Sequence, residues 1–391
     1  MKLSHHVLKT SNVYYNTVTK IRLPLDSSEE TLRKHHCIRG QEKEAIRSVL
    51  LNRPADQVMG IAIAPTFECN LRCTHCMVKH LLVEENQKID IAGTKAFISK
   101  CKDRYNLTSL MITFYGGESL LAIQDCADII SEISTLVMVR FSLFSNLSME
   151  LTDQHMEFLA QADTIGVSID GLEQEHNKQR LWLHESGNAF QAVIQNLKKL
   201  VLAGLKDKIQ LQACLRDEFS TPEMQKEFYK FALRYGILPE KVTVGVIGPS
   251  KTDPEPGEKF LKGLNAPTFI SGPCCKYRQN NLSIDNTGNI YSDYYSYVKL
   301  GTIYDDPALI EEQQEKLILE TAPALNDPKC KICPIVGYCW GGCSMVENTG
   351  NKLSKYCDEK RKVVHENMLE RAKSNTLIQE PQDDSTQPNL H

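Results

Sequence analysis

Three cysteines in one short loop are the residues with the clearest chemistry in the sequence. Cys69, Cys73 and Cys76 are separated by three and by two residues, so their thiolates can converge on one metal centre. Iron–sulfur cubanes normally take four cysteine ligands, so three would leave one iron open, as in a catalytic rather than a structural metal site. A zinc knuckle is the simpler alternative, but its fourth ligand, His75, stands next to Cys76 and is poorly placed to complete a tetrahedron.

A second group of cysteines lies closer to the C-terminus. The pattern C-x2-C-x5-C-x3-C begins at Cys330, and a further cysteine follows at position 357. Two adjacent cysteines stand upstream, at positions 274 and 275. Such a density of thiols indicates iron–sulfur clusters or a zinc ribbon.

The composition limits what these thiols can do. The chain has 391 residues, 14 cysteines, 41% hydrophobic residues and a net charge of -4, so it can form a real core and gives no electrostatic case for binding nucleic acid. No apolar stretch approaches the ~20 residues of a membrane span, and the N-terminus lacks the apolar segment of a secretory signal. We therefore expect a cytoplasmic protein with no nucleic-acid or membrane partner. Its cysteines should serve metal binding or catalysis rather than disulfides.

Four cysteines lie outside both groups, at positions 37, 101, 126 and 214. Those at 101 and 126 fall in helix-like segments and Cys214 in a strand-like one, where a buried free thiol behaves as a small apolar residue. We assign these four no function.

From residue 58 to about 250, short apolar runs alternate with longer segments of helical period. Continuous apolar runs are typical of parallel strands covered by helices on both faces. Six such βα units predict right-handed crossovers and a parallel sheet, open or curved into an incomplete barrel. The expected strands are 58–64, 110–114, 139–144, 164–169, 209–215 and 242–247, and the expected helices are 91–105, 121–137, 152–161, 189–203 and 221–235.

Polar or glycine-rich residues follow the first strands, at the edge of the sheet where such folds place their chemistry. The cysteine loop follows the first strand, and Gly116-Gly117-Glu118 follows the second. Two glycines allow close approach of a ligand, and a carboxylate there suits an ammonium group. The third strand ends in Ser145-Asn146.

The cysteine triplet, with the aromatic His75 before its last member, resembles the signature of radical S-adenosylmethionine (SAM) enzymes. The resemblance implies an α/β fold, an incomplete (β/α)6 TIM-like barrel. It also implies a [4Fe-4S] cluster whose open iron binds the methionine part of SAM, and a 5′-deoxyadenosyl radical that abstracts hydrogen from the substrate. By the same resemblance, the Gly-Gly-Glu motif holds the methionine amino group, and Ser145 and Asn146 help to bind the cofactor.

The fourth strand and the segment after it resemble the S-I-D-G…H-D-x-x-R stretch of peptide-modifying radical SAM enzymes, with Asn177 in place of the usual Asp. Ser168 and Arg180 are the candidates for the ribose or carboxylate of the cofactor. Asp170 is the candidate catalytic residue, with a structural turn carboxylate as the equal alternative. The cofactor-binding candidates are His75, Gly116, Gly117, Glu118, Ser145, Asn146, Ser168 and Arg180.

The second cysteine group resembles the SPASM domain, which binds two auxiliary iron–sulfur clusters. One cluster would be closed by Cys330, Cys333, Cys339 and Cys357. The other would be held by Cys343 and Cys275, with Cys274 as a further candidate.

One position departs from the SPASM pattern, because Asp293 stands where the cysteine of its G-x4-C element is expected. A carboxylate is a harder and weaker ligand for iron than a thiolate. The first auxiliary cluster could therefore be Asp-ligated, completed by Cys274, left with an open iron, or smaller than a cubane.

The resemblance covers residues 59–365 and predicts a maturase of a ribosomally made precursor peptide. It would install a C–C, C–O or C–S cross-link or excise part of the backbone, with flavodoxin or ferredoxin as electron donor. Three alternatives remain: a sulfatase-type formylglycine maturase, a radical SAM enzyme acting on a small molecule, and a zinc-binding interaction protein without enzymatic activity.

We expect five segments. Residues 1–57 form an N-terminal extension with a strand-like stretch at 13–25 and a helix opened by a capping box at Ser27. This extension is too short for a complete leader-recognition domain, so it is a reduced site or a bridging element, or a separate protein recognises the leader. The radical SAM core follows at 58–250, and a linker occupies 251–272. We expect the SPASM domain at 273–368 and a tail at 369–391 that is disordered at its end.

Overall fold

The computed structural model describes residues 2–9, 13–52, 57–76, 78–83, 87–184, 187–216, 221–247, 277–294 and 298–341. The chain divides into two compact units. Unit 1 consists of Met1–Asn52, Phe269–Arg278 and Glu315–His391, and unit 2 consists of Arg53–Thr268 and Gln279–Gln314. None of the described helices is both long and apolar enough to cross a membrane.

Unit 2 is built on a nine-stranded sheet with the order β12-β11-β10-β4-β5-β6-β7-β8-β9. Strands β4 to β9 are parallel neighbours in chain order, β10 joins β4 in parallel, and β11 and β12 continue antiparallel. The predicted α/β fold with six successive parallel strands is confirmed, and the described strands leave β9 and β12 as the ends of the sheet. The strands are β4 (Val58–Ile63), β5 (Ser109–Phe114), β6 (Met138–Ser145), β7 (Thr164–Ser168), β8 (Ile209–Arg216), β9 (Val242–Ile247), β10 (Asn281–Ile284), β11 (Asn289–Tyr291) and β12 (Lys299–Thr302).

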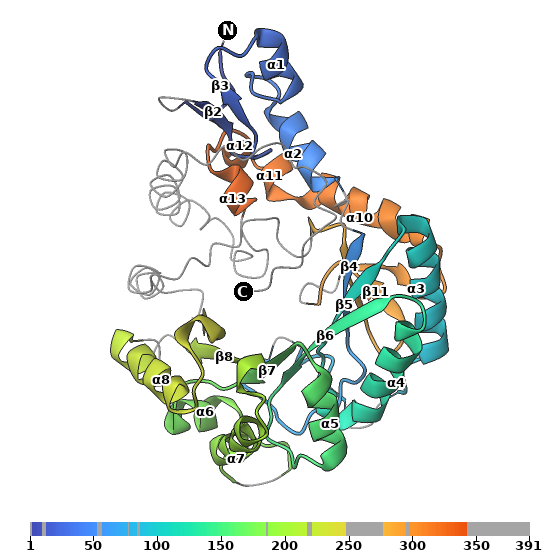
Figure 1. Cartoon of the computed structure of the whole chain (residues 1–391), viewed down its shortest axis with the longest axis vertical. Helices are drawn as coiled ribbons and strands as arrows, with labels where there is room; N and C mark the ends of the chain where they lie inside the picture. The colour runs from blue at the N-terminus through green and yellow to red at the C-terminus, as the bar shows by residue number, and fades with distance from the viewer. Residues whose placement is uncertain are drawn as a thin grey trace. The chain divides into compact units, whose positions relative to one another are not determined.

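Helices connect the parallel strands, and α3, α4 and α5 lie along one face of the sheet (Figure 1). The five predicted helices are present, with boundaries shifted by no more than a few residues. A further helix, α6, follows β7. The helices are α3 (Ile91–Tyr105), α4 (Ile123–Ser134), α5 (Asp153–Gln161), α6 (Glu173–Gln179), α7 (Ala189–Leu202), α8 (Pro222–Arg234) and α10 (Pro307–Thr321), with short 3-10 turns η1 (Ser119–Ala122), η2 (Lys206–Lys208) and η4 (Pro239–Lys241).

Aromatic side chains fill the space between this sheet and α5. The ring of Phe114 on β5 lies 6.1 Å from that of Phe141 on β6 and 6.0 Å from that of Phe158 on α5. The rings of Phe141 and Phe158 are 4.8 Å apart. Each ring removes a large apolar area from water, so the strands that carry the site rest on a rigid base.

Unit 1 combines N-terminal elements with elements from the last third of the chain. A three-stranded antiparallel sheet of order β1-β2-β3 is followed by two helices, and three short helices come from the region beyond residue 320. These elements are β1 (Val7–Lys9), β2 (Val13–Asn16), β3 (Arg22–Pro24), α1 (Glu29–Lys34), α2 (Glu42–Leu50), α11 (Pro323–Asn326), α12 (Pro328–Lys331) and α13 (Val336–Cys339).

Two local predictions for the N-terminal residues were wrong. The strand-like stretch is a hairpin of β2 and β3, because Asn16 accepts hydrogen bonds from the amides of Val18 and Thr19 (3.0 and 3.2 Å) and closes a turn. The N-cap of helix α1 lies one residue later than predicted. Its N-cap is Ser28 rather than Ser27, and the Ser28 side chain accepts from the Thr31 amide.

One apolar cluster in unit 1 combines N-terminal residues with residues between 277 and 340. Ala45, Ile46 and Leu50 of α2 pack with residues of α10 to α13 such as Ile318 and Trp340. The N-terminal residues are therefore part of the core that supports the cysteine-rich region.

Replacing Ile46 with alanine should lower the free energy of unfolding of unit 1 by about 2–5 kcal/mol, because Ile46 is fully buried and truncation leaves a cavity. Denaturant unfolding measured through circular dichroism would test this. The control Lys43→Ala, at an exposed position of the same helix, should change the value by less than about 0.5 kcal/mol. Equal effects of the two changes would contradict the shared core.

Candidate functional site

The cysteine loop follows β4 directly, and backbone hydrogen bonds fix it to the last residue of α6 and to the segment after that helix. The amide of Arg72 donates to the carbonyl of Leu181 (2.7 Å), and the amide of Thr74 donates to that of Gln179 (2.8 Å). These bonds run between the cysteines, so the positions of the thiols are set by two segments far apart in the sequence.

N–H groups are directed at two of the sulfurs. The Leu71 amide and the Asn146 Nδ2 donate to the Cys69 Sγ (3.4 and 3.8 Å), and the Arg180 Nη1 donates to the Cys73 Sγ (3.9 Å). Hydrogen bonds to ligand sulfur stabilise its anionic, metal-bound form and tune an iron–sulfur cluster.

Without metal, the three thiols are held protonated. Burial raises the pKa of Cys69 to about 12 and that of Cys73 to about 11, and it also raises the pKa of Cys76. When a neighbouring thiol of the triplet ionises, its negative charge raises the pKa of Cys69 and Cys73 further. A cation that binds thiolates relieves both penalties. Three thiols in one loop, two of them facing N–H donors, therefore fit a [4Fe-4S] cluster.

The two glycines after β5 allow the backbone of this loop to contact the cysteine loop. Gly116 has a φ of 120°, and a Cβ there would overlap the Thr66 carbonyl oxygen. A Cβ on Gly117 would overlap the Glu68 carbonyl oxygen. The Gly117 amide donates to Thr66 (3.0 Å) and the Glu118 amide to Glu68 (2.7 Å). Glycine is thus required at both positions because the backbone of this loop packs directly against the cysteine loop.

The Glu118 side chain is 1% exposed and joins the ends of two strands. Its carboxylate accepts from the Ser145 hydroxyl (2.8 Å), the Asn146 amide (2.7 Å) and the Leu120 amide (3.1 Å). Burial raises the pKa of Glu118 in spite of these donors. The predicted trio of Glu118, Ser145 and Asn146 does come together, but its members bind one another.

Asp170 is the centre of a second buried group. Its carboxylate binds Arg180 through two N–H groups (2.8 and 3.0 Å) and accepts from the Cys214 amide (2.8 Å), and it lies 3.4 Å from His75 Nε2. Burial acts to lower the pKa of Arg180, but the Asp170 carboxylate and the Cys73 thiol outweigh it and raise that pKa. Arg180 is therefore a permanent cation beside Cys73.

Cys214 is a residue of this site that sequence reasoning missed. Its Sγ, the His75 ring and the Asp170 carboxylate have ligand atoms within 4.8 Å of one another. Burial raises the pKa of the Cys214 thiol to about 11. The available signal was its position at the carboxyl end of a predicted strand, where the fold gathers functional groups. Because Arg180 already occupies the Asp170 carboxylate, this trio does not favour a cation.

Ser168, the remaining cofactor candidate, is the last residue of β7 and is half-buried beside Gln212 of β8. It stands at the same end of the sheet as the cysteine loop, two residues before Asp170.

The second cysteine group is only partly described. Cys330 is buried in α12 and Cys333 is half-buried, and the Cys333 amide donates to the Cys330 carbonyl (3.0 Å) in a tight turn. Asp293, in unit 2, is 3% exposed. The other predicted ligands lie outside the described residues, and so does the side chain of Cys339. They are Cys274, Cys275, Cys343 and Cys357.

Residues 63–217 match the model of the radical SAM superfamily. No curated protein matches the chain. Among solved structures, native anSMEcpe, an anaerobic sulfatase-maturating enzyme, with bound AdoMet is similar at 15% identity and a TM-score of 0.62, over 80% of this chain and 99% of that one. The same enzyme with bound AdoMet and the Cp18Cys peptide is similar at 16% identity and a TM-score of 0.59, over 81% of this chain and 100% of that one.

The chain therefore contains a radical SAM domain and is a radical SAM enzyme. Its cofactors are a [4Fe-4S] cluster and SAM. The zinc-binding, non-enzymatic alternative is wrong.

Replacing Asp170 with asparagine should destabilise the protein by about 3–5 kcal/mol, because it leaves the buried Arg180 charge uncompensated. The matched control is Asp163→Asn, which breaks an ion pair with Arg140 (3.1 Å) whose two side chains are 37% and 47% exposed. That change should cost less than about 1 kcal/mol. Denaturant unfolding of both variants measures the difference, and similar losses would argue against the buried pair.

The buried His176 should make the protein less stable in acid. Burial lowers its pKa to about 3, with Arg180 as the next cause, whereas the unfolded chain has the ordinary value of about 6.5. Between these values only the unfolded chain takes up the proton, so the stability falls as the pH drops through this window, by up to about 1.4 kcal/mol per pH unit. His176→Gln should remove this component from unfolding free energies measured against pH. An unchanged pH dependence would show that His176 does not stay neutral.

Proposed function

We propose that the chain is a radical SAM maturase that modifies a ribosomally made precursor peptide. One observation supports this above the rest. The fold similarity extends over the whole of a chain whose structure holds AdoMet together with a peptide, rather than over the radical SAM domain alone. A peptide is therefore the favoured class of substrate.

The proposed reaction begins with removal of a hydrogen atom from a side-chain or α carbon of the peptide and ends in a cross-link or in excision of backbone. The cluster and SAM, when bound, supply the electron and the hydrogen-abstracting radical. Cys69, Cys73 and Cys76 would hold the cluster, and the N–H groups of Asn146 and Arg180 would stabilise its sulfur ligands.

We assign SAM to the space bordered by His75, the Gly-Gly-Glu loop and Ser168. Because Asp170 is fully buried and already binds Arg180 and the Cys214 amide, a positioning role suits it better than the catalytic role considered from the sequence. Arg180 would then act on the cluster from Cys73 rather than bind the ribose or carboxylate of SAM.

We also propose that the second cysteine group holds one or two auxiliary clusters, as in the SPASM domain. The turn at Cys330 and Cys333 directs two thiols from one short segment, and a closed cluster would supplement the small core of unit 1. Asp293 stays a candidate ligand, as a carboxylate that is 3% exposed.

The sulfatase-type reaction is the second candidate, because the similar solved structures belong to an enzyme of that kind. It would oxidise a serine or cysteine side chain to formylglycine in a protein substrate. A radical SAM enzyme for a small molecule is the third candidate, without an observation in its favour.

The proposed partners are the precursor peptide and a small electron donor such as flavodoxin or ferredoxin, in the cytoplasm. The peptide leader would be recognised by unit 1 or by a separate protein. Deleting residues 1–57 is a poor test of this role, since α2 is part of the core of unit 1. Single substitutions on the surface of unit 1 are preferable.

Anaerobically reconstituted protein should release 5′-deoxyadenosine from SAM when dithionite is added. Cys73→Ser should lower this rate by about 100-fold or more, because it removes a cluster ligand. The matched control Cys126→Ser alters a buried thiol that donates to the Ser119 carbonyl (3.7 Å), a bond that a serine hydroxyl can replace, so its rate should change little. Equal rates for all three proteins would contradict the assigned cluster.

Co-expression with the neighbouring short open reading frame, followed by mass spectrometry of the peptide, tests the substrate class. Loss of two hydrogens with a bond between two residues supports a cross-link, and a larger loss supports excision. Conversion of a single cysteine or serine to an aldehyde supports the sulfatase-type reaction. A peptide that stays unmodified while 5′-deoxyadenosine forms would contradict both.

A further inference from the structure

Unit 1 contains a pocket of about 700 Å³, formed by the turn between β2 and β3, the end of α1, one face of α2 and the helix α13. Part of its lining is apolar and consists of Val18, Ile21, Val49 and Trp340. A volume of this size accommodates several side chains of a ligand.

The polar lining of the pocket carries two lysines and two histidines. Lys20 comes from the turn after β2, and Lys34, His35 and His36 come from the end of α1. Among the described residues of the lining there is no carboxylate, although the chain as a whole has a net charge of -4. The pocket therefore favours an anionic ligand group.

A buried asparagine holds the two cationic segments together. The Asn16 side chain is fully buried, and its Oδ1 accepts from the amides at the start of the turn that carries Lys20. Its Nδ2 donates to the carbonyls of His35 and His36 (3.2 and 3.1 Å). One side chain thus joins the backbone of the two segments that carry Lys20 and Lys34.

Two residues of the polar lining have left-handed backbone conformations, with φ of 63° for Lys20 and 55° for His36. Non-glycine residues persist in this region only where their surroundings hold them, which is common at ligand sites. The Lys20 ammonium group is itself oriented. It donates to the Gly337 carbonyl (2.8 Å) and lies 3.2 Å from the centre of the Tyr338 ring.

The lining also includes buried polar atoms that have no hydrogen-bond partner in the described structure. They are the Trp340 Nε1, the His36 Nδ1 and the Thr19 Oγ1, and the Trp340 side chain is only 2% exposed. Buried polar groups normally have a partner. An indole N–H can only donate, so Trp340 requires an acceptor that a carboxylate or a peptide carbonyl would supply.

We propose that this pocket binds an acidic peptide segment in which apolar residues alternate with aspartate or glutamate. The apolar lining would receive the apolar side chains, while the ammonium groups of Lys20 and Lys34 would receive the carboxylates. A small anion would leave the apolar part of the pocket empty. Identifying the segment as part of the peptide substrate rests on the proposed function, whereas the binding itself does not.

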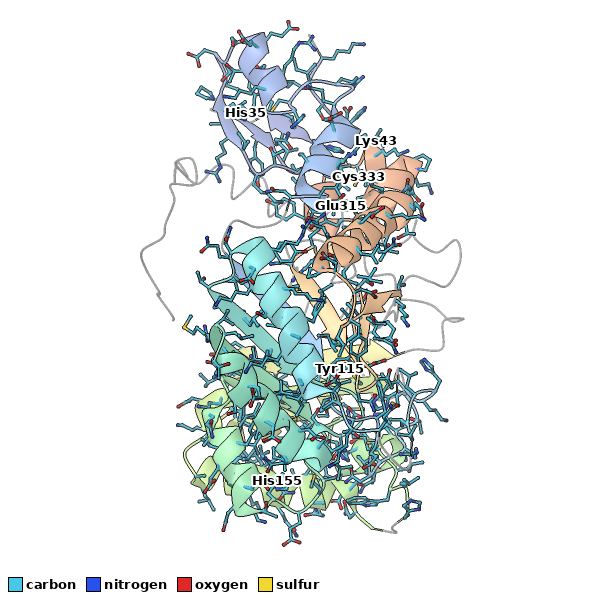
Figure 2. All side chains as sticks on the ribbon, turned by 90° about the vertical axis from the view of Figure 1, so that its right-hand side faces the viewer. His35, Lys43, Tyr115, His155, Glu315 and Cys333 are labelled. Atoms are coloured by element: carbon cyan, nitrogen blue, oxygen red, sulfur yellow. The ribbon has the colours of Figure 1, made fainter. Side chains whose placement is uncertain are left out.

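The test measures fluorescence anisotropy of a short fluorescein-labelled peptide of alternating leucine and glutamate, added to the full chain without SAM. The glutamine analogue should bind about tenfold more weakly, and added salt should weaken binding of the acidic peptide. Lys34→Glu should weaken it about fivefold, because a charge in the pocket is reversed. The control Lys43→Glu makes the same charge change on α2 outside the pocket lining and should alter binding by less than about twofold (Figure 2).

Location is tested through Trp340, which is the only tryptophan left in a Trp182→Phe chain. Its emission should change when the unlabelled acidic peptide binds. An unchanged emission, or equal losses for Lys34→Glu and Lys43→Glu, would overturn the proposed site. Displacement of the peptide by inorganic phosphate at the same concentration would overturn it as well, because the pocket would then be a small-anion site.

The two proposals fail separately. If Lys34→Glu weakens peptide binding but no peptide is ever modified, the pocket stands and the proposed function falls. If Lys34→Glu binds and modifies the substrate peptide with unchanged affinity and KM, the pocket proposal falls and the maturase function stands.

Discussion

The buried carboxylate of Asp170 is the interaction on which the arrangement of the site depends. It joins β7, which it follows, to β8 through the Cys214 amide and to the end of α6 through Arg180. Arg180 in turn contacts Cys73, and His75 lies beside the same carboxylate. A buried charge is tolerated only when it is fully paired. A shift of the end of α6 would leave the Asp170 charge unpaired, and a shift of β8 would remove the hydrogen bond from the Cys214 amide, so the carboxylate keeps these segments in register.

Two buried carboxylates at this edge of the sheet have different hydrogen-bond and charge partners. Each of these surroundings affects the pKa of a neighbouring thiol in a different way. Glu118 accepts hydrogen bonds from neutral donors only, and its charge raises the pKa of Cys69. Asp170 is neutralised by Arg180, which acts to lower the pKa of Cys73. The metal-free site thus holds more potential negative charge than positive. The positive charge of the iron ions in a cluster would offset this negative charge. The bound cluster thus explains why so many acidic side chains and thiols are buried together.

The order of the parallel strands could be predicted because each strand is a continuous apolar run, and such runs require cover on both faces. The same pattern of apolar runs predicted which residues lie together at the carboxyl ends of the strands. The partners of these residues could not be predicted, since Glu118 and Arg180 bind side chains that are distant in the sequence. Cys214 was missed because an isolated thiol in a strand is usually a core residue. Its backbone contact with Asp170 exists only in the folded sheet.

The packing of the N-terminal residues could not be predicted either, because their partners are also distant in the sequence. Their sequence contains a hairpin and two short helices, which are too few to bury a core of their own. The structure resolves this by packing α2 against helices from beyond residue 320. Gly337 is part of the solution, because a Cβ there would overlap the Thr17 carbonyl oxygen. The cysteine turn at Cys330 therefore depends on residues more than 270 positions away, so a change in the N-terminal helices can affect the second cysteine group without touching it.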